Sequence, residues 1–169
     1  MMTDVFSSAE RSAVMTRIRS KDTKPEVFVR RLLFASGFRY RLHSDRLQGH
    51  PDVVLPKWRV VVFVNGCFWH SHEGCPRAAR PSDNADFWAA KLRRNKERDA
   101  ENRRILTGEG WRVLVVWECA CRKRTSQTLR ELMAMFIREE TAPYGEIGRT
   151  EVAEDRIGGC PVLGDPPLD

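Results

Sequence analysis

The sequence has no apolar run that approaches the roughly 20 residues needed to cross a bilayer. Its first twenty residues, Met1–Ser20, carry too many charges for a secretory signal. Internal repeats are also lacking. Because 41% of the 169 residues are hydrophobic and 31% are charged, we expect a single globular domain. Because the sequence has neither a long apolar run nor a secretory signal, we expect the protein to stay in the cytoplasm and to have no membrane partner.

Nothing in the sequence favours a disulfide framework. The chain holds five cysteines but has no signal that would take it out of the reducing cytoplasm, where thiols stay free. Metal ligation is therefore the natural use for a cluster of these cysteines.

The charges are distributed unevenly along the chain. Residues 141–169 carry two basic and six acidic side chains, which leaves 27 basic and 17 acidic side chains, a net charge of +10, in residues 1–140. Such an excess indicates a polyanionic partner, although many basic proteins bind nothing in particular. Nucleic acid is favoured over a membrane surface because no helix pairs a basic face with a long apolar face.

The hydrophobic pattern predicts four helices and four strands. Helices are expected from Ser7 or Ser8 to Ser20, from a capping box at Thr23–Glu26 to Gly37, over 86–107, and from Thr125 or Ser126 onward. Strands are expected over 38–43, 51–55, 60–64 and 111–117. The first three form a meander, and the fourth lies parallel to the third because a helix separates them. Residues 141–169 lack periodicity and predict a disordered acidic tail that includes Cys160.

A long loop over residues 66–85 follows the third predicted strand, and loops of this length are usually functional or fixed by another group. Within it, Cys67, His72 and Cys75 supply three possible metal ligands, and Cys119 or Cys121 could supply a fourth. Four such ligands form a tetrahedral, structural zinc site. The alternative is that these are unrelated buried thiols.

Asp52 follows Pro51 at the start of a predicted strand, the position at which PD-(D/E)xK nucleases hold Mg²⁺. Those enzymes place Asp/Glu-x-Lys on the next strand, whereas Phe63-Val64-Asn65 offers neither a carboxylate nor a lysine. On this dipeptide alone, an aspartate that enters a strand and merely solvates a turn is the better explanation.

A combination of motifs favours the interpretation of Asp52 as a metal-binding residue of a nuclease. It consists of Glu26 in the capping box, Pro51-Asp52, Gly66-Cys67-Phe68-Trp69-His70, Glu97-Arg98-Asp99, and Trp111 to Cys119 ending in Trp-Glu-Cys. Over about residues 8–140 the chain closely resembles the very short patch repair (Vsr) endonucleases. The resemblance implies an α/β, restriction-endonuclease-like fold of the PD-(D/E)xK type, with a mixed central sheet flanked by helices and a structural zinc site. It also implies a bacterial, nucleoid-associated enzyme whose endonuclease domain spans 1–140, with 1–22 as a DNA-clamping helix.

That family nicks DNA 5′ to the thymine of a T:G mismatch left by deamination of 5-methylcytosine. The resemblance implies that Asp52 and the backbone carbonyl of Val64 bind Mg²⁺. Thr is usual in the family at the position of Val64, and the carbonyl remains available. His70 resembles the catalytic base, and Asp99 and Glu26 resemble acidic residues that orient it or bind metal-bound water.

The resemblance also implies the roles of several neighbouring side chains. The zinc ligands correspond to Cys67, His72, Cys75 and Cys119, although Ser71 and Glu73-Gly74 alter the usual histidine-rich run and add a residue before Cys75. Phe68, Trp69 and Trp88 correspond to aromatics that intercalate beside the mismatch, and the alternative is that they are core aromatics. Lys91 and Asn95 fall on the same helix face as Trp88 and Asp99, so we expect them to contact DNA.

We therefore expect a monomeric, Mg²⁺-dependent endonuclease that acts on double-stranded DNA carrying T:G. The resemblance further implies a functional link to a cytosine methyltransferase and to mismatch-repair proteins. Two alternatives remain: a restriction-like nuclease of the same fold with another target, and a non-catalytic, zinc-stabilised DNA-binding module.

Overall fold

The computed structural model describes residues 21–42, 44–82, 84–139 and 142–153. The helix predicted before residue 20 and the residues after 153, including Cys160, lie outside these ranges. The helices are α2 (Lys24–Ala35), α3 (Ala85–Gly108) and α4 (Ser126–Glu139), and the strands are β1 (Arg41–Leu42), β2 (Val53–Leu55), β3 (Val60–Asn65), β4 (Arg112–Trp117) and β5 (Tyr144–Ile147). Short 3-10 turns cover Pro56–Trp58, Pro76–Ala78, Glu118–Ala120 and Lys123–Thr125.

The five strands form one mixed sheet in the order β1-β2-β3-β4-β5. The first three are antiparallel, with Val54 opposite Val61, which confirms the predicted meander. β4 runs parallel to β3, with Val62 beside Leu114, as the intervening helix predicts. β1 covers only Arg41–Leu42 among the described residues of the predicted strand, because these two are the ones that pair with Val54 and Val53 of β2. Phe38 is buried and packs edge-on against Trp58.

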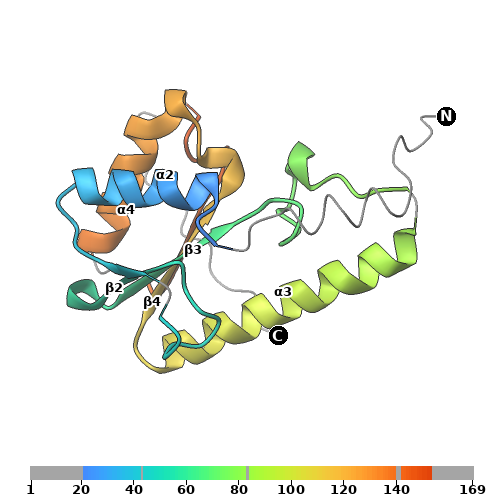
Figure 1. Cartoon of the computed structure of the whole chain (residues 1–169), viewed down its shortest axis with the longest axis horizontal. Coiled ribbons are helices and arrows are strands. Elements are labelled where there is room, and N and C mark those ends of the chain that lie inside the picture. The colour runs from blue at the N-terminus through green and yellow to red at the C-terminus, as the bar shows by residue number, and fades with distance from the viewer. Residues whose placement is uncertain (1–20, 43, 83, 140–141, 154–169) are drawn as a thin grey trace.

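Helices cover both faces of the sheet (Figure 1). α2 and α4 share one face, where Val29, Leu33 and Met133 join alternate residues of the strands in the main core. The C-terminal half of α3 covers the other face through Leu106. This mixed α/β arrangement of a sheet flanked by helices agrees with the predicted fold class. None of the helices in the described ranges combines the length and apolarity that a bilayer crossing requires.

The capping box predicted at the start of α2 is present. The Thr23 side chain accepts the Glu26 backbone N–H at 3.4 Å, and a Glu26 carboxylate oxygen accepts the Asp22 N–H at 2.9 Å. Gly37 follows the helix with a φ of 84°, the left-handed conformation that commonly ends helices.

The starts of the other two helices lie close to the expected positions. α3 begins at Ala85, and Asn84 precedes it in a left-handed conformation without a capping bond from its side chain. α4 begins at Ser126, while the Thr125 hydroxyl donates to the Ala120 carbonyl at 2.8 Å. The apolar stripe predicted for α4 is confirmed, since Leu129, Met133, Phe136 and Ile137 are buried.

The prediction of a disordered tail from residue 141 was wrong for its first part. Tyr144–Ile147 forms β5, which pairs parallel to β4 with Ile147 beside Val116. The segment contains Gly and Glu, which are uncommon in strands, and its four residues are too few for a periodic signal. Gly145 is favoured here because a Cβ atom would lie 2.8 Å from the Phe136 ring of α4. The contact that explains this strand is therefore a tertiary one.

Candidate active site and metal centre

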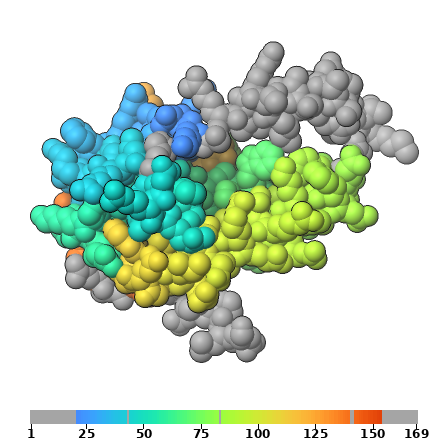
Figure 2. Space-filling model, turned by 60° about the horizontal axis from the view of Figure 1, so that its bottom comes forward, coloured from blue at the N-terminus to red at the C-terminus, as the bar shows by residue number. Residues whose placement is uncertain are grey.

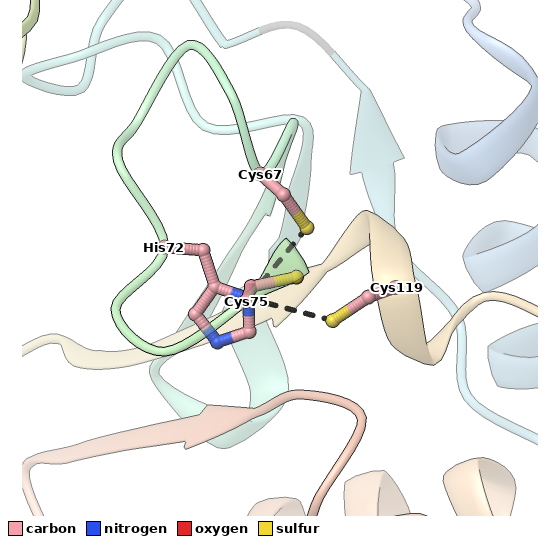
Figure 3. A group of neighbouring side chains, drawn as sticks. All are labelled: Cys67, His72, Cys75 and Cys119. Carbon is pink, nitrogen blue, oxygen red and sulfur yellow. Dashed lines mark hydrogen bonds between the residues drawn. The ribbon is translucent and has the colours of Figure 1, made fainter. Parts of the chain in front are cut away.

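The predicted metal ligands converge from two parts of the chain (Figure 3). Cys67, His72 and Cys75 come from the loop after β3, Cys119 comes from the turn after β4, and their ligand atoms all lie within 4.8 Å of one another. His72 Nδ1 is 3.6 Å from Cys67 Sγ and 3.4 Å from Cys119 Sγ. Zinc bonds of about 2.0–2.3 Å at tetrahedral angles separate ligand atoms by roughly 3.5–3.8 Å. The four side chains therefore fit one tetrahedral ion.

Backbone bonds in the loop place these ligands. The His72 N–H donates to the Cys67 carbonyl at 2.9 Å, and the Cys75 N–H donates to the His72 carbonyl at 3.3 Å. The His72 ring also stacks on Trp117 of β4, with centroids 4.1 Å apart and an interplanar angle of 6°. Trp117 in turn donates its indole N–H to Glu146 of β5. The sheet thus holds the imidazole in a fixed orientation.

Burial sets the protonation of the ligands. It raises the pKa of the Cys67 and Cys119 thiols above the ordinary range and lowers the pKa of His72. A neutral imidazole is ready to bind a metal, whereas buried thiolates need a cation beside them. Such a donor set suits a thiophilic dication.

Cys121 is not one of these four residues, although the sequence left it open as a ligand. Its sulfur lies 3.7 Å from the Trp117 carbonyl oxygen, and burial raises the pKa of its thiol to about 12. Cys121 is therefore a half-buried neutral thiol, and Cys119 is the residue that the fold brings to the cluster.

Asp52 lies beside the end of β3. Its Oδ2 accepts the backbone N–H of Val64 at 2.7 Å, across the antiparallel pairing of β2 with β3. The structure thus brings together the two residues that the resemblance assigned to Mg²⁺, a carboxylate and the peptide at position 64. Asp52 and Val64 are twelve residues apart in the sequence, so the sequence alone does not establish this contact.

His70 and Asp99 form a close pair between the loop and α3. His70 Nδ1 and Asp99 Oδ2 are 2.5 Å apart, and the two side chains are 25% and 31% exposed. A carboxylate at Nδ1 favours the tautomer whose lone pair is on Nε2. The ring is therefore oriented and primed to accept a proton at Nε2.

The Asp52 and His70 groups are tied to the same end of the same strand. Asp52 binds the Val64 N–H, and the His70 N–H donates to the carbonyl of Gly66, two residues further on. Two residues of extended chain span roughly 7 Å. The Asp52 side chain and the backbone of His70 are therefore both bound to residues at or just after the C-terminal end of β3.

Glu26 has a structural role that the capping box anticipated. It is 4% exposed; its carboxylate accepts from Asp22 N, from the Thr23 hydroxyl at 2.7 Å and from Arg30 Nη2 at 3.0 Å. These contacts account for a buried carboxylate at the start of α2.

A cavity of about 930 Å³ opens between α3, the sheet and the segment 44–50. Figure 2 shows the segment 44–50 against the C-terminal half of α3, where Gln48 donates to the buried Asn102. His70 and Asp99 line the cavity, whereas Asp52 and Glu26 are not among the described residues that do. The histidine pair is therefore reachable from solvent through this space.

The predicted aromatics gather beside the histidine pair. The ring centroid of Phe68 is 5.1 Å from that of Trp69 and 5.3 Å from that of Trp88, and the Lys91 ammonium lies 5.3 Å from the Trp69 ring. The three rings are only partly buried. This cluster is a half-exposed surface feature, which argues against the alternative of ordinary core aromatics.

Two further residues complete that cluster. Phe87, which sequence reasoning passed over, is 59% exposed and packs edge-on against Trp88. Its position in a very polar helix was the signal that could have found it. Asn95 Nδ2 donates to the Trp69 carbonyl at 2.9 Å, so it positions the aromatic loop from α3.

Comparison with known proteins agrees with this geometry. The model of the family described as "DNA mismatch endonuclease Vsr" matches residues 3–76. The type II nicking enzyme V.NmeAIP of Neisseria meningitidis is 47% identical over 137 residues, 78% of this chain and 97% of the relative. DNA mismatch endonuclease Vsr of Escherichia coli is 40% identical over 144 residues, 83% of this chain and 92% of the relative. The type II nicking enzyme V.NaeI of Lentzea aerocolonigenes is 44% identical over 154 residues, 88% of this chain and 86% of the relative.

The chain belongs to the Vsr family of DNA mismatch endonucleases. Membership in the Vsr family confirms the resemblance that the motifs carried and the prediction of a DNA endonuclease.

Proposed function

We propose that this chain is a strand-nicking endonuclease that cuts 5′ to the thymine of a T:G mismatch in double-stranded DNA and so initiates very short patch repair. The observation that carries the proposal is the arrangement at the end of β3: Asp52 accepts the Val64 N–H, and the loop that follows carries His70, which pairs with Asp99 of α3. This set offers a metal-binding carboxylate and an oriented base, which phosphodiester hydrolysis requires.

Magnesium is the ion that the carboxylate and a peptide carbonyl suit, since it prefers oxygen ligands and keeps several waters. Asp52 and the carbonyl of Val64 would hold it, and when bound it would neutralise charge on the scissile phosphate. His70 takes the proton of the attacking water at Nε2, and Asp99 stabilises the imidazolium that results. Glu26 supports the start of α2 from its capping box, and a bond to metal-bound water is its second proposed role.

Zinc is the ion proposed for Cys67, His72, Cys75 and Cys119. A site in which the protein supplies all four ligands has no open position, so its role is structural. It would fix the loop that carries His70, Phe68 and Trp69. We also propose that the fold is restriction-endonuclease-like, and this proposal rests on membership in the Vsr family.

Recognition of the mismatch is assigned to the aromatic cluster. Phe68, Trp69 and Trp88 would enter the base stack, at a cost of a few kcal/mol per step that is smaller beside a mispair. Lys91 and the basic residues of α3 would contact phosphates, in keeping with the excess of positive charge in residues 1–140. The clamp proposed for residues 1–22 lies almost wholly outside the described residues.

The enzyme is proposed to act as a monomer, with a functional link to a cytosine methyltransferase that generates its substrate. Help from mismatch-repair proteins is a further proposal. The endonuclease domain extends past residue 140, because β5 completes the sheet.

A nicking assay tests the proposal directly. Supercoiled or end-labelled duplexes that differ only in T:G or T:A are incubated with the enzyme over a range of Mg²⁺ concentrations. We expect Mg²⁺-dependent nicking 5′ to the mispaired thymine, and Asp52→Asn should lower the rate by at least about 100-fold. Asp45→Asn is the matched control, since its carboxylate is 87% exposed.

Cutting of T:A at the same rate as T:G would favour the alternative of a restriction-like nuclease with another target. Tight mismatch binding without a nick at any metal concentration would favour the non-catalytic module. The close pairing of His70 with Asp99 is the observation that weighs against the second alternative.

A further inference from the structure

The segment that follows β5 packs against His72 of the metal-binding cluster. At Gly148, a Cβ atom would lie 2.8 Å from Cε1 and 3.0 Å from Nε2 of His72. The His72 ring therefore directs Nδ1 toward the cysteine sulfurs and its Nε2 edge toward the Gly148 backbone. Gly148 has an ordinary backbone conformation, so only this close contact requires a residue without a side chain.

The same segment also contacts a second ligand. The backbone N–H of Arg149 donates to the sulfur of Cys119, and an N–H group aimed at a thiolate stabilises its negative charge. Two adjacent residues outside the ligand set thus contact two different ligands.

A carboxylate fixes the geometry of this turn. Glu151 Oε2 accepts the Gly148 N–H at 2.7 Å, and its Oε1 accepts the Thr150 hydroxyl at 2.9 Å. Glu151 therefore holds the Gly148 backbone in place against the His72 ring.

The turn is anchored at both ends. β5 pairs with β4 up to Ile147, and Val152 is 1% exposed within the main hydrophobic core. Residues 148–151 therefore cannot move away from the metal centre without breaking core contacts.

We propose that Gly148, Arg149 and Glu151 form the outer shell of the metal centre and determine how tightly the four ligands hold their ion. The inference rests on the zinc site proposed above and adds residues from a part of the chain that carries no ligand. Outer-shell groups of this kind commonly change metal affinity by about 10–100-fold.

The test uses the full-length zinc-loaded protein and two variants. Gly148→Ala should push the His72 ring away and increase the rate of zinc transfer to a coloured chelator by about tenfold or more. Glu151→Gln removes the charge without creating a clash and should increase that rate severalfold. The matched controls are Gly108→Ala, where a Cβ atom meets nothing within 4 Å, and Glu109→Gln, an exposed glutamate; both should release zinc at the wild-type rate.

Substitution of zinc by Co²⁺ supplies a readout that packing alone does not affect. We expect the visible d–d bands and the sulfur-to-cobalt charge-transfer bands to shift in Gly148→Ala and Glu151→Gln, because the ligand field changes. If Gly148→Ala does not fold, Glu151→Gln still decides the question.

Wild-type release rates and unchanged cobalt spectra in folded variants would overturn the outer-shell inference and leave the zinc site standing. Purified wild-type protein without one equivalent of zinc would overturn the zinc site, and the inference with it. The two failures are therefore distinguishable by the zinc content of the wild type.

Discussion

At the scale of single residues, the pairing of His70 with Asp99 is the most informative contact. The 2.5 Å separation of Nδ1 and Oδ2 joins a loop residue to a helix residue 29 positions away. The carboxylate binds Nδ1 of the ring, which leaves Nε2 available to accept a proton.

Replacement of Asp99 by Asn should therefore reduce nicking without reducing DNA binding. The amide cannot stabilise the imidazolium, and we expect single-turnover rates on T:G duplexes to fall by about 10²–10⁴-fold. Glu101→Gln on the same helix is the control, because its exposed bond to Arg104 contributes little. Equal rates for Asp99→Asn and Glu101→Gln would show that the pair does not serve catalysis.

The aromatic cluster makes a separate prediction. Trp69→Ala removes one stacking surface, worth about 1–3 kcal/mol per base. Affinity for a T:G duplex, measured by fluorescence anisotropy, should fall about tenfold or more, and the loss should be smaller for T:A. Phe34→Ala, which truncates an aromatic that is 57% exposed on α2, should leave both affinities unchanged. An equal loss for both duplexes would assign Trp69 to general binding.

At the scale of elements, β5 shows how a sheet acquires a strand that its sequence conceals. Gly145 and Glu146 are poor strand formers, yet the free edge of β4 supplies the hydrogen bonds and Phe136 occupies the space beside Gly145. β5 then presents Glu146 to the Trp117 indole and leads into the turn over His72. A segment expected to be a tail is thus part of the scaffold of the site.

Gly145→Ala tests this role. The added methyl group would lie 2.8 Å from the Phe136 ring, so we expect the free energy of unfolding in urea to fall by about 1–3 kcal/mol. Gly108→Ala adds the same methyl group where nothing lies within 4 Å and should change stability by less than about 1 kcal/mol. A Gly145→Ala protein as stable as the wild type would argue against the packing of β5 on α4.

At the scale of the whole molecule, the metal centre joins parts of the chain that are distant in sequence. The ligands connect the loop after β3 to the turn after β4, and β5 and its following turn close over them. His70, the proposed base, and the aromatic residues Phe68 and Trp69 lie on that same loop. Loss of the metal should therefore disturb both catalysis and recognition at once.

A pair of cysteine variants measures this effect. Cys75→Ser removes one of the four ligands and should lower zinc content well below one equivalent and the melting temperature by about 10 °C. Nicking should fall even in saturating Mg²⁺. Cys121→Ser should retain zinc, since its sulfur contacts only the Trp117 carbonyl among the contacts described for it. Zinc retained by Cys75→Ser would show that the cluster is not the ion's site.

Much of the site was predictable because its signals are local. The capping box of α2, the apolar stripe of α4 and the close spacing of Cys67, His72 and Cys75 are patterns within a few residues. The meander and the parallel pair follow from the lengths of the connections between strands. The choice of Cys119 over Cys121, by contrast, came from family resemblance, because spacing treats the two cysteines alike.

The sequence by itself determined the kinds of ligands, the order of most elements within the described ranges, the basic charge and the family. Only the tertiary structure decided that Asp52 lies on the Val64 peptide, that residues 144–147 form a strand, and that Gly148 faces His72. The physical reason is range: caps and periodicity depend on neighbours along the chain, whereas these contacts depend on partners that the sheet brings together from distant positions.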